Sequence, residues 1–174
     1  MELNIKSLEN RINLSVKNYK EYSKTFTPIE IEIIPRKKKY GKFINMNENE
    51  IYYHIYFNDN KEEIKRNYLD DNVSKIKIII DYQVKSFKDL FSWYKYIESI
   101  NFKKFYRNNI TDMSYMFCNC SSLKELNLNN FNTNNVTNMY GMFIECLNEL
   151  KLKIKSQFKN IKEEAFKYYI FINK

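Results

Sequence analysis

Residues 110–143 read ITDMSYMFCNCSSLKELNLNNFNTNNVTNMYGMF, and the end of this stretch begins a second copy of its start. Displacing the chain by about 26 residues superposes identical side chains, which is the sign of an internal repeat. The matching pairs are Thr111 with Thr137, Met113 with Met139, Met116 with Met142, Phe117 with Phe143 and Cys120 with Cys146. The same displacement backwards finds a degenerate copy from Val84. The C-terminal half is therefore predicted to consist of repeats.

Each repeat divides into two halves with different periodicities. In the first half, apolar side chains at i, i+3 and i+4, such as Met113, Met116 and Phe117, predict a short helix. The second half has the form L-x-x-L-x-L, as in residues 123–128, which predicts a short strand. Such elements bury their apolar faces when copies stack. The expected fold class is α/β: a short leucine-rich-repeat solenoid with parallel strands on one side and short helices on the other, preceded by a β-rich N-terminal cap.

The repeats also predict how the chain is divided. An N-terminal capping region rich in helix and strand is expected over residues 1–83, and the repeats over residues 84–174. The expected units are 84–109, 110–135, 136–159 and a terminal cap, 160–174. In the third unit, Leu150 is expected to replace the first leucine ahead of a strand at Leu152 and Ile154. The cap is expected to contain a helix from Ile161 and a closing strand, Ile170–Ile172.

Residues 1–83 are interpreted from local pattern alone. Residues 1–27 fit either a helical stripe or a strand. The stripe would comprise Ile5, Leu8, Ile12, Val16 and Tyr19, and the strand Ile12, Leu14 and Val16. Strands are predicted at residues 29–35, 40–46, 51–57 and 73–82, and a short helix from Asp59. The basic run Arg36–Lys39 with Gly41 predicts a hairpin turn, which is either merely solvated or serves as a contact with an acidic surface or as a localisation signal.

The composition argues against several classes of protein. The chain has 174 residues, 44% of them hydrophobic, and a formal charge of +8. Its basic residues are nearly all lysine, whereas nucleic-acid readers favour arginine for bidentate contacts. The N-terminus lacks the apolar core of a signal peptide, and no stretch approaches the ~18 apolar residues of a membrane helix. The sequence as written therefore predicts a cytoplasmic protein without a membrane span.

Residues that could carry chemistry are better explained by packing. His54 lies in a predicted strand without an evident catalytic partner, and two isolated glycines cannot form a phosphate-binding loop. Cys120 and Cys146 share a repeat position and are expected to stack as small core residues, with a metal site or a disulfide as the open alternatives. The methionine pairs are expected in the core, and the asparagine runs between repeats are expected to bond the backbone of neighbouring units. We expect no enzyme, no cofactor and no metal.

Residues 110–143 resemble the BspA-type leucine-rich repeat family of mycoplasmas, other bacteria and protists. The family's order is D-M-S-x-M-F-x-x-C-x-S-L-x-x-L-x-L-x-x-F-x-T-x-x-V-T-x-M. The residues that meet it are Asp112, Met113, Ser114, Met116, Phe117, Cys120, Ser122, Leu123, Leu126, Leu128, Phe131, Thr133, Val136, Thr137 and Met139. The resemblance implies a role in attachment or in binding other proteins, and secretion or surface exposure for many members.

In stacked repeats the outward strand positions form one surface, which we take as the candidate binding site. It comprises Ser99, Asn101, Lys103, Glu125, Asn127, Asn129, Lys151, Lys153 and Lys155. This row becomes basic toward the C-terminus, which favours an acidic protein partner. We therefore expect a non-catalytic protein-protein interaction module. The alternative is a weak binder of nucleic acid or another anionic surface through lysine-rich patches, and an exposed terminal coil also allows a homodimer.

Overall fold

The computed structural model describes residues 15–20, 23 and 26–168, without the side chains of residues 47–49. Residues 15–20 are helical and exposed. The earlier part of the expected N-terminal stripe or strand, Ile5 to Leu14, lies outside the described residues. So does the expected closing strand Ile170–Ile172.

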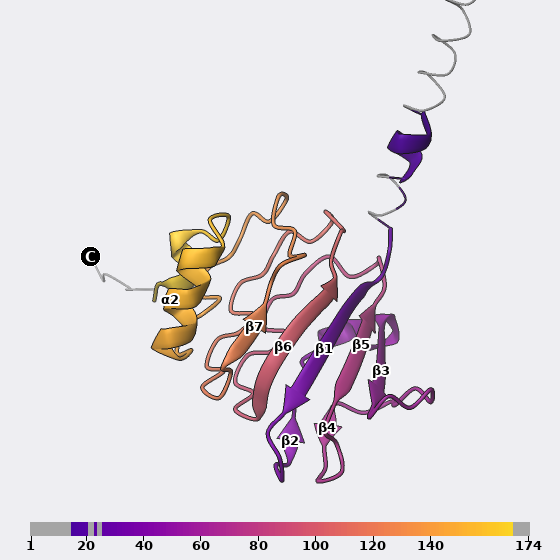
Figure 1. The fold of residues 1–174 in the computed structure, drawn as a ribbon, viewed down its shortest axis with the longest axis vertical. Helices are drawn as coiled ribbons and strands as arrows, with labels where there is room; N and C mark the ends of the chain where they lie inside the picture. Colours follow the sequence, from indigo (N-terminus) through magenta and orange to yellow (C-terminus); the bar gives the residue numbers. More distant parts are fainter. Residues whose placement is uncertain (1–14, 21–22, 24–25, 169–174) are drawn as a thin grey trace, which may run out of the picture.

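The described part centres on a five-stranded sheet in the order β3-β5-β1-β6-β7 (Figure 1). Its strands are β1 (Ile29–Pro35), β3 (Tyr53–Phe57), β5 (Ile76–Ile80), β6 (Ile97–Lys104) and β7 (Glu125–Asn127). Strand β1 lies between β5 and β6 and is antiparallel to both, and β3 is antiparallel to β5. The sheet therefore continues across the expected boundary at residue 83.

Three expected N-terminal strands are confirmed, and two other local predictions are wrong. The confirmed strands are β1, β3 and β5, where isoleucines and aromatic residues alternate with polar ones. The expected helix from Asp59 is wrong, because this segment leads instead into β4 (Tyr68–Leu69). The expected hairpin is also wrong, because β2 (Gly41–Lys42) pairs with β4 rather than with β1. A 3-10 helix, η1 (Asn47–Tyr52), precedes β3.

The first two repeat strands are confirmed as a parallel pair. Strand β6 pairs with β7 so that Ser99 faces Glu125 and Asn101 faces Asn127. This register equals the interval of the sequence repeat, so equivalent positions of two units lie side by side.

The expected repeat helices are wrong, because series of turns occupy their places. The backbone is left-handed at Asp89, Tyr115 and Gly141, which share one repeat position. A right-handed helix does not continue through such a residue. Backbone N–H groups donate to the next unit instead: that of Phe91 to the carbonyl of Met116 (2.8 Å) and that of Phe117 to the carbonyl of Met142 (3.0 Å). Apolar residues at i, i+3 and i+4 thus reach the core from turns.

The prediction of a third repeat strand is also wrong, because helix α2 (Asn148–Gln157) lies in its place. Leu150 and Ile154, one helical turn apart, are buried, whereas Leu152 is 68% exposed. Leu150 thus enters the core as expected, but from a helix. A short 3-10 helix, η2 (Glu163–Phe166), follows α2.

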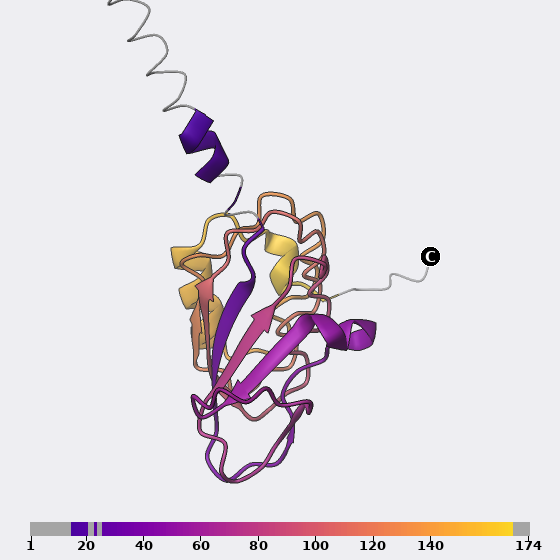
Figure 2. The ribbon, with the colours of Figure 1, turned by 90° about the vertical axis from the view of Figure 1, so that its right-hand side faces the viewer.

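The expected fold class is therefore corrected. The described residues form a mixed, mostly β fold with few helices, and not a helix-capped repeat solenoid. Three of the four strand pairings in the main sheet are antiparallel, which stacked repeats cannot supply. Figure 2 shows the turns lying on one side of the sheet.

The core lies between the sheet and these turns. Four phenylalanine rings from successive units stack there, Phe91 on Phe117, Phe117 on Phe143 and Phe143 on Phe166, with centroids 5.3–5.8 Å apart. Among the described residues, no helix is long and apolar enough to cross a membrane.

The expected places of the cysteines, methionines and asparagines are confirmed. The thiols of Cys120 and Cys146 are buried and donate to carbonyls of the preceding unit (2.8 and 3.0 Å). The repeat methionines, Met113, Met116, Met139 and Met142, are buried. The Asn130 and Asn135 amides donate to the carbonyls of Lys103 and Asn108 (3.1 and 2.8 Å). These side chains therefore hold adjacent units in register.

Candidate functional site

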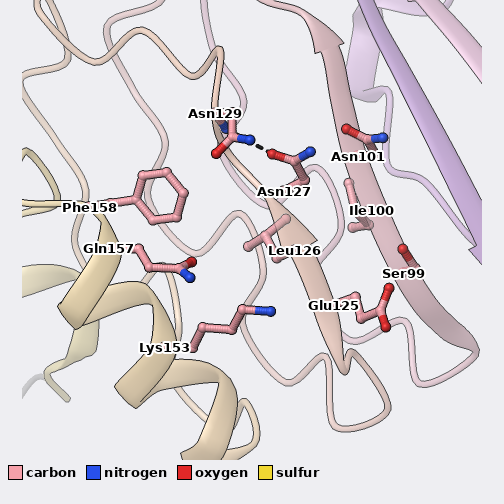
Figure 3. Close-up of a pocket in the computed structure, with 10 residues that line it drawn as sticks. All are labelled: Ser99, Ile100, Asn101, Glu125, Leu126, Asn127, Asn129, Lys153, Gln157 and Phe158. Atoms are coloured by element: carbon pink, nitrogen blue, oxygen red, sulfur yellow. Dashed lines mark hydrogen bonds between the residues drawn. The ribbon is translucent and has the colours of Figure 1, made fainter.

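A groove of about 370 Å³ lies between α2 and the outward faces of β6 and β7 (Figure 3). The strands supply its floor, and Lys153 and Gln157 reach toward them from α2. The lining residues are Ser99, Ile100, Asn101, Glu125, Leu126, Asn127, Asn129, Lys153, Gln157 and Phe158. The groove is therefore a polar trough with one helical wall.

The wall exists because the third unit is helical. Leu150 and Ile154 anchor α2 in the core. Residues four apart lie on one side of a helix, so Lys153 and Gln157 project together from the side that lines the groove. A third strand in this place would have covered the edge of β7.

The outer edge of β7 faces this groove. In a parallel strand, alternate residues direct both backbone groups to the same neighbour. Arg36 donates its N–H to the carbonyl of Tyr96 (2.8 Å), which sets the alternation of hydrogen bonds along β1 and β6. Together with the register of β6 and β7, this alternation directs the N–H and C=O groups of Glu125 and Asn127 toward β6 and those of Leu126 away from it. Leu126 has no further backbone hydrogen bond among the described residues. The edge is therefore available to another extended chain.

The groove contains two exposed charges, Glu125 and Lys153, that form no hydrogen bond or ion pair with the described part of the chain. Elsewhere on the same sheet face, charges compensate one another. Lys103 lies 3.3 Å from Glu32, and Glu30 pairs with Lys104 at 3.1 Å and with Lys77 at 3.7 Å. Unpaired charge on the sheet face therefore concentrates at the groove.

The structure brings together six of the nine residues of the candidate surface. These are Ser99, Asn101, Glu125, Asn127, Asn129 and Lys153. Lys103 lies farther along β6 and pairs with Glu32. Lys151 and Lys155 lie elsewhere on α2 and line a second hollow of about 430 Å³ with Phe166.

Four lining residues of the groove were absent from the candidate surface: Ile100, Leu126, Gln157 and Phe158. The first two were expected on the core face of the strands. The last two depend on the third unit being helical, since Gln157 lies one helical turn after Lys153. The buried pair Leu150 and Ile154, at a spacing of four, was the available signal for this helix.

His54 is held between two carboxylates away from the groove. Its Nε2 lies 3.2 Å from Asp81 and its Nδ1 3.3 Å from Glu63. The hydrogen bond with Asp81, reinforced by Glu63, raises the pKa of His54. The charged ring is therefore favoured, and it joins three segments of the N-terminal region.

The repeat cysteines are poor nucleophiles. Burial raises the pKa of Cys146 to about 12 and that of Cys120 well above its ordinary value. Because the thiolate is the reactive form, both side chains act as packing groups at neutral pH. In the described part of the chain, no cluster of three or more histidine, cysteine or acidic residues is arranged to hold a metal ion.

Comparison with known proteins identifies a family. The family described as "Mycoplasma protein of unknown function, DUF285" matches residues 65–167, more than half of the chain. The chain therefore belongs to this family. No curated protein and no solved structure matches it significantly.

Proposed function

We propose that this member of the DUF285 family is a non-catalytic protein-interaction module that binds a short extended segment of a partner protein beside β7. The observation that carries the proposal is the unpaired edge of β7, which faces a groove of about 370 Å³. An extended peptide can add to an exposed sheet edge through main-chain hydrogen bonds. Because β7 spans only Glu125–Asn127, these bonds are few, and side-chain contacts must add to them.

The side chains of the groove indicate what kind of segment would fit. Lys153 is exposed and without an acidic partner among the described residues, so it favours an acidic side chain in the bound segment. Glu125 favours a basic one on the strand side. Phe158, which is half-buried, offers an apolar contact at the end of the helical wall. A short segment carrying both charges is therefore the expected ligand.

A binding role accords better with the residues of the groove than catalysis does. Its charged side chains are Glu125 and Lys153, one from the strand and one from the helix, and neither histidine nor cysteine is among its lining residues. His54 is already engaged by Asp81 and Glu63. Uncommitted polar groups in an open trough suit recognition of an extended chain.

The repeat itself further supports a relationship to BspA-type repeats, as part of the same proposal. Residues 110–143 follow that family's order at fifteen positions, from Asp112 to Met139. The same repeat interval relates β6 to β7 and Phe91 to Phe117. The relationship would add attachment to surfaces or to other proteins as the biological setting of the groove.

Two substitutions at one position test the proposed binding mode. Proline at Leu126 removes the N–H that faces the groove, and proline is tolerated in an edge strand where this side faces solvent. Alanine at the same position removes the same buried side chain but keeps the N–H. Peptides that bind the protein would first be selected from a phage-displayed random library, and their affinities measured by calorimetry.

We expect Leu126→Pro to bind a selected peptide about tenfold more weakly than Leu126→Ala, since one tenfold step corresponds to about 1.4 kcal/mol, near the net value of a hydrogen bond. Circular dichroism would show that both variants are folded. Equal affinities of the two variants would remove the main-chain binding mode, and failure to select any groove-binding peptide would remove the proposed function.

A further inference from the structure

The connection between β1 and β2 carries the basic run Arg36–Lys39 and lies at the end of the sheet where β1 terminates (Figure 1). Lys37, Lys38 and Lys39 are exposed and form no ion pair or hydrogen bond with the residues that the structure describes. Three adjacent cations therefore protrude from the protein without compensation.

Segments with exposed aromatic residues lie next to this run. The backbone N–H of Arg36 donates to the carbonyl of Tyr96 (2.8 Å), which places the turn of residues 93–96 beside it. Lys42 pairs with Tyr68 across β2 and β4, and its ammonium lies 5.7 Å from the centre of that ring. Trp93, Tyr40 and Tyr68 are 65%, 62% and 52% exposed. The basic-aromatic end is defined as Arg36, Lys37, Lys38, Lys39, Tyr40, Lys42, Tyr68, Trp93 and Lys95.

The acidic groups nearest this end are already engaged. Asp71 accepts a hydrogen bond from the Tyr40 hydroxyl, and Asp70 lies 2.6 Å from Arg66. Glu98 lies 2.7 Å from Lys124. The lysines of the run therefore keep their full charge for an external anion.

We propose that the basic-aromatic end binds the surface of a membrane that contains anionic lipids. Lysines next to a membrane are attracted to anionic headgroups, and tryptophan and tyrosine rings settle at the boundary between headgroups and acyl chains. A protruding loop flanked by such rings matches a flat anionic surface.

This arrangement suits a single-stranded nucleic acid less well. Proteins that bind such strands combine a basic groove with aromatic platforms on which bases stack. The lysine run is a turn, and its residues line neither of the hollows beside α2. Arg36 also commits its guanidinium to the Ser122 hydroxyl (3.1 Å). Oligonucleotide binding is accordingly an outcome that would count against the proposal.

The test uses the full chain and vesicles of phosphatidylcholine, either alone or with about one third phosphatidylglycerol. Trp93 is the one tryptophan of the sequence, so its fluorescence reports directly on this end. The test variant is K37E/K38E/K39E. The control, K61E/K159E/K167E, makes the same change of net charge at exposed lysines elsewhere.

We expect the wild-type protein to sediment with the anionic vesicles and the Trp93 emission to shift to the blue. The test variant should bind about tenfold more weakly or worse, while the control loses less, and salt should weaken all binding. Equal binding to both vesicle types, equal losses in both triple variants, or tight binding to a single-stranded oligonucleotide instead of vesicles would overturn the proposal. Leu126→Pro should bind vesicles normally, so the membrane site and the groove are tested separately.

Discussion

At the scale of single residues, His54 shows how a strand residue becomes a cross-link. The carboxylates of Asp81 and Glu63 each contact one of its two ring nitrogens, and the hydrogen bond with Asp81 is the main cause of the raised pKa of His54. Lys65, followed by His54, lowers the pKa of Glu63. Both shifts indicate that the charged forms are favoured in the folded protein.

The two shifts act in opposite pH directions. A histidine whose pKa is raised in the folded protein stabilises the fold fully when the pH is below its unfolded pKa of 6.5. This contribution is lost as the pH rises through the folded pKa. A carboxylate whose pKa is lowered stabilises the fold when the pH is above its unfolded pKa of 4.5, and this contribution is lost as the pH falls through the folded pKa. The pair of shifts therefore defines a window between 4.5 and 6.5 in which both contributions are present.

We predict that His54→Gln destabilises the protein more at about pH 5.5 than at about pH 9, because the charged ring is lost with rising pH in the wild-type protein. Urea unfolding of both proteins at the two pH values measures this difference. An NMR titration of the sole histidine should show a midpoint above 6.5. A midpoint at or below that value, or equal destabilisation at both pH values, would refute the assigned role.

Sequence reasoning placed His54 in a strand but did not find its partners. Glu63 follows in a segment that was predicted to be helical, and Asp81 lies at the end of β5. Their meeting depends on the antiparallel pairing of β3 with β5, which sets Tyr53 opposite Ile80. A sequence pattern does not state which strands pair, so such a contact stays hidden from it.

At the scale of elements, α2 is the clearest departure from the repeat pattern. In a strand, Leu150, Leu152 and Ile154 would share one buried face. In the helix, Leu150 and Ile154 are buried and Leu152 is 68% exposed. A strand and a helix therefore predict different losses of folding stability when these side chains are replaced by alanine.

We predict that Ile154→Ala lowers the free energy of unfolding by roughly 2–5 kcal/mol, because it removes a fully buried side chain. Leu152→Ala should change it by less than about 0.5 kcal/mol, as expected for an exposed position. Urea denaturation of both variants provides the comparison. Similar large losses at both positions would indicate a strand at residues 150–154 and would remove the helical wall of the groove.

The repeat halves show which elements a periodicity can predict. The form L-x-x-L-x-L correctly predicted β6 and β7, because alternation fits few structures other than a strand. Apolar residues at i, i+3 and i+4 were wrongly interpreted as helices. Turns bury the same side chains when the backbone is left-handed at Asp89, Tyr115 and Gly141, and its N–H groups bond the neighbouring unit. Local spacing contains neither of these features.

At the scale of the whole molecule, the groove results from joining two kinds of pairing in one sheet. Antiparallel strands from the N-terminal half flank the parallel repeat pair, and the third unit turns helical beside it. The repeat interval was sufficient to predict that Ser99 and Glu125 lie side by side. It could not predict that Lys153 would face them across a groove, because that depends on the change from strand to helix.

The central claim is that an extended segment adds to the edge of β7, and backbone amide exchange tests it most directly. With a selected peptide bound, hydrogen exchange followed by NMR should slow at the amide of Leu126, which faces the groove. The amides of Glu125 and Asn127 face β6 and should change little. Tight peptide binding with unchanged exchange at Leu126 would contradict the claim.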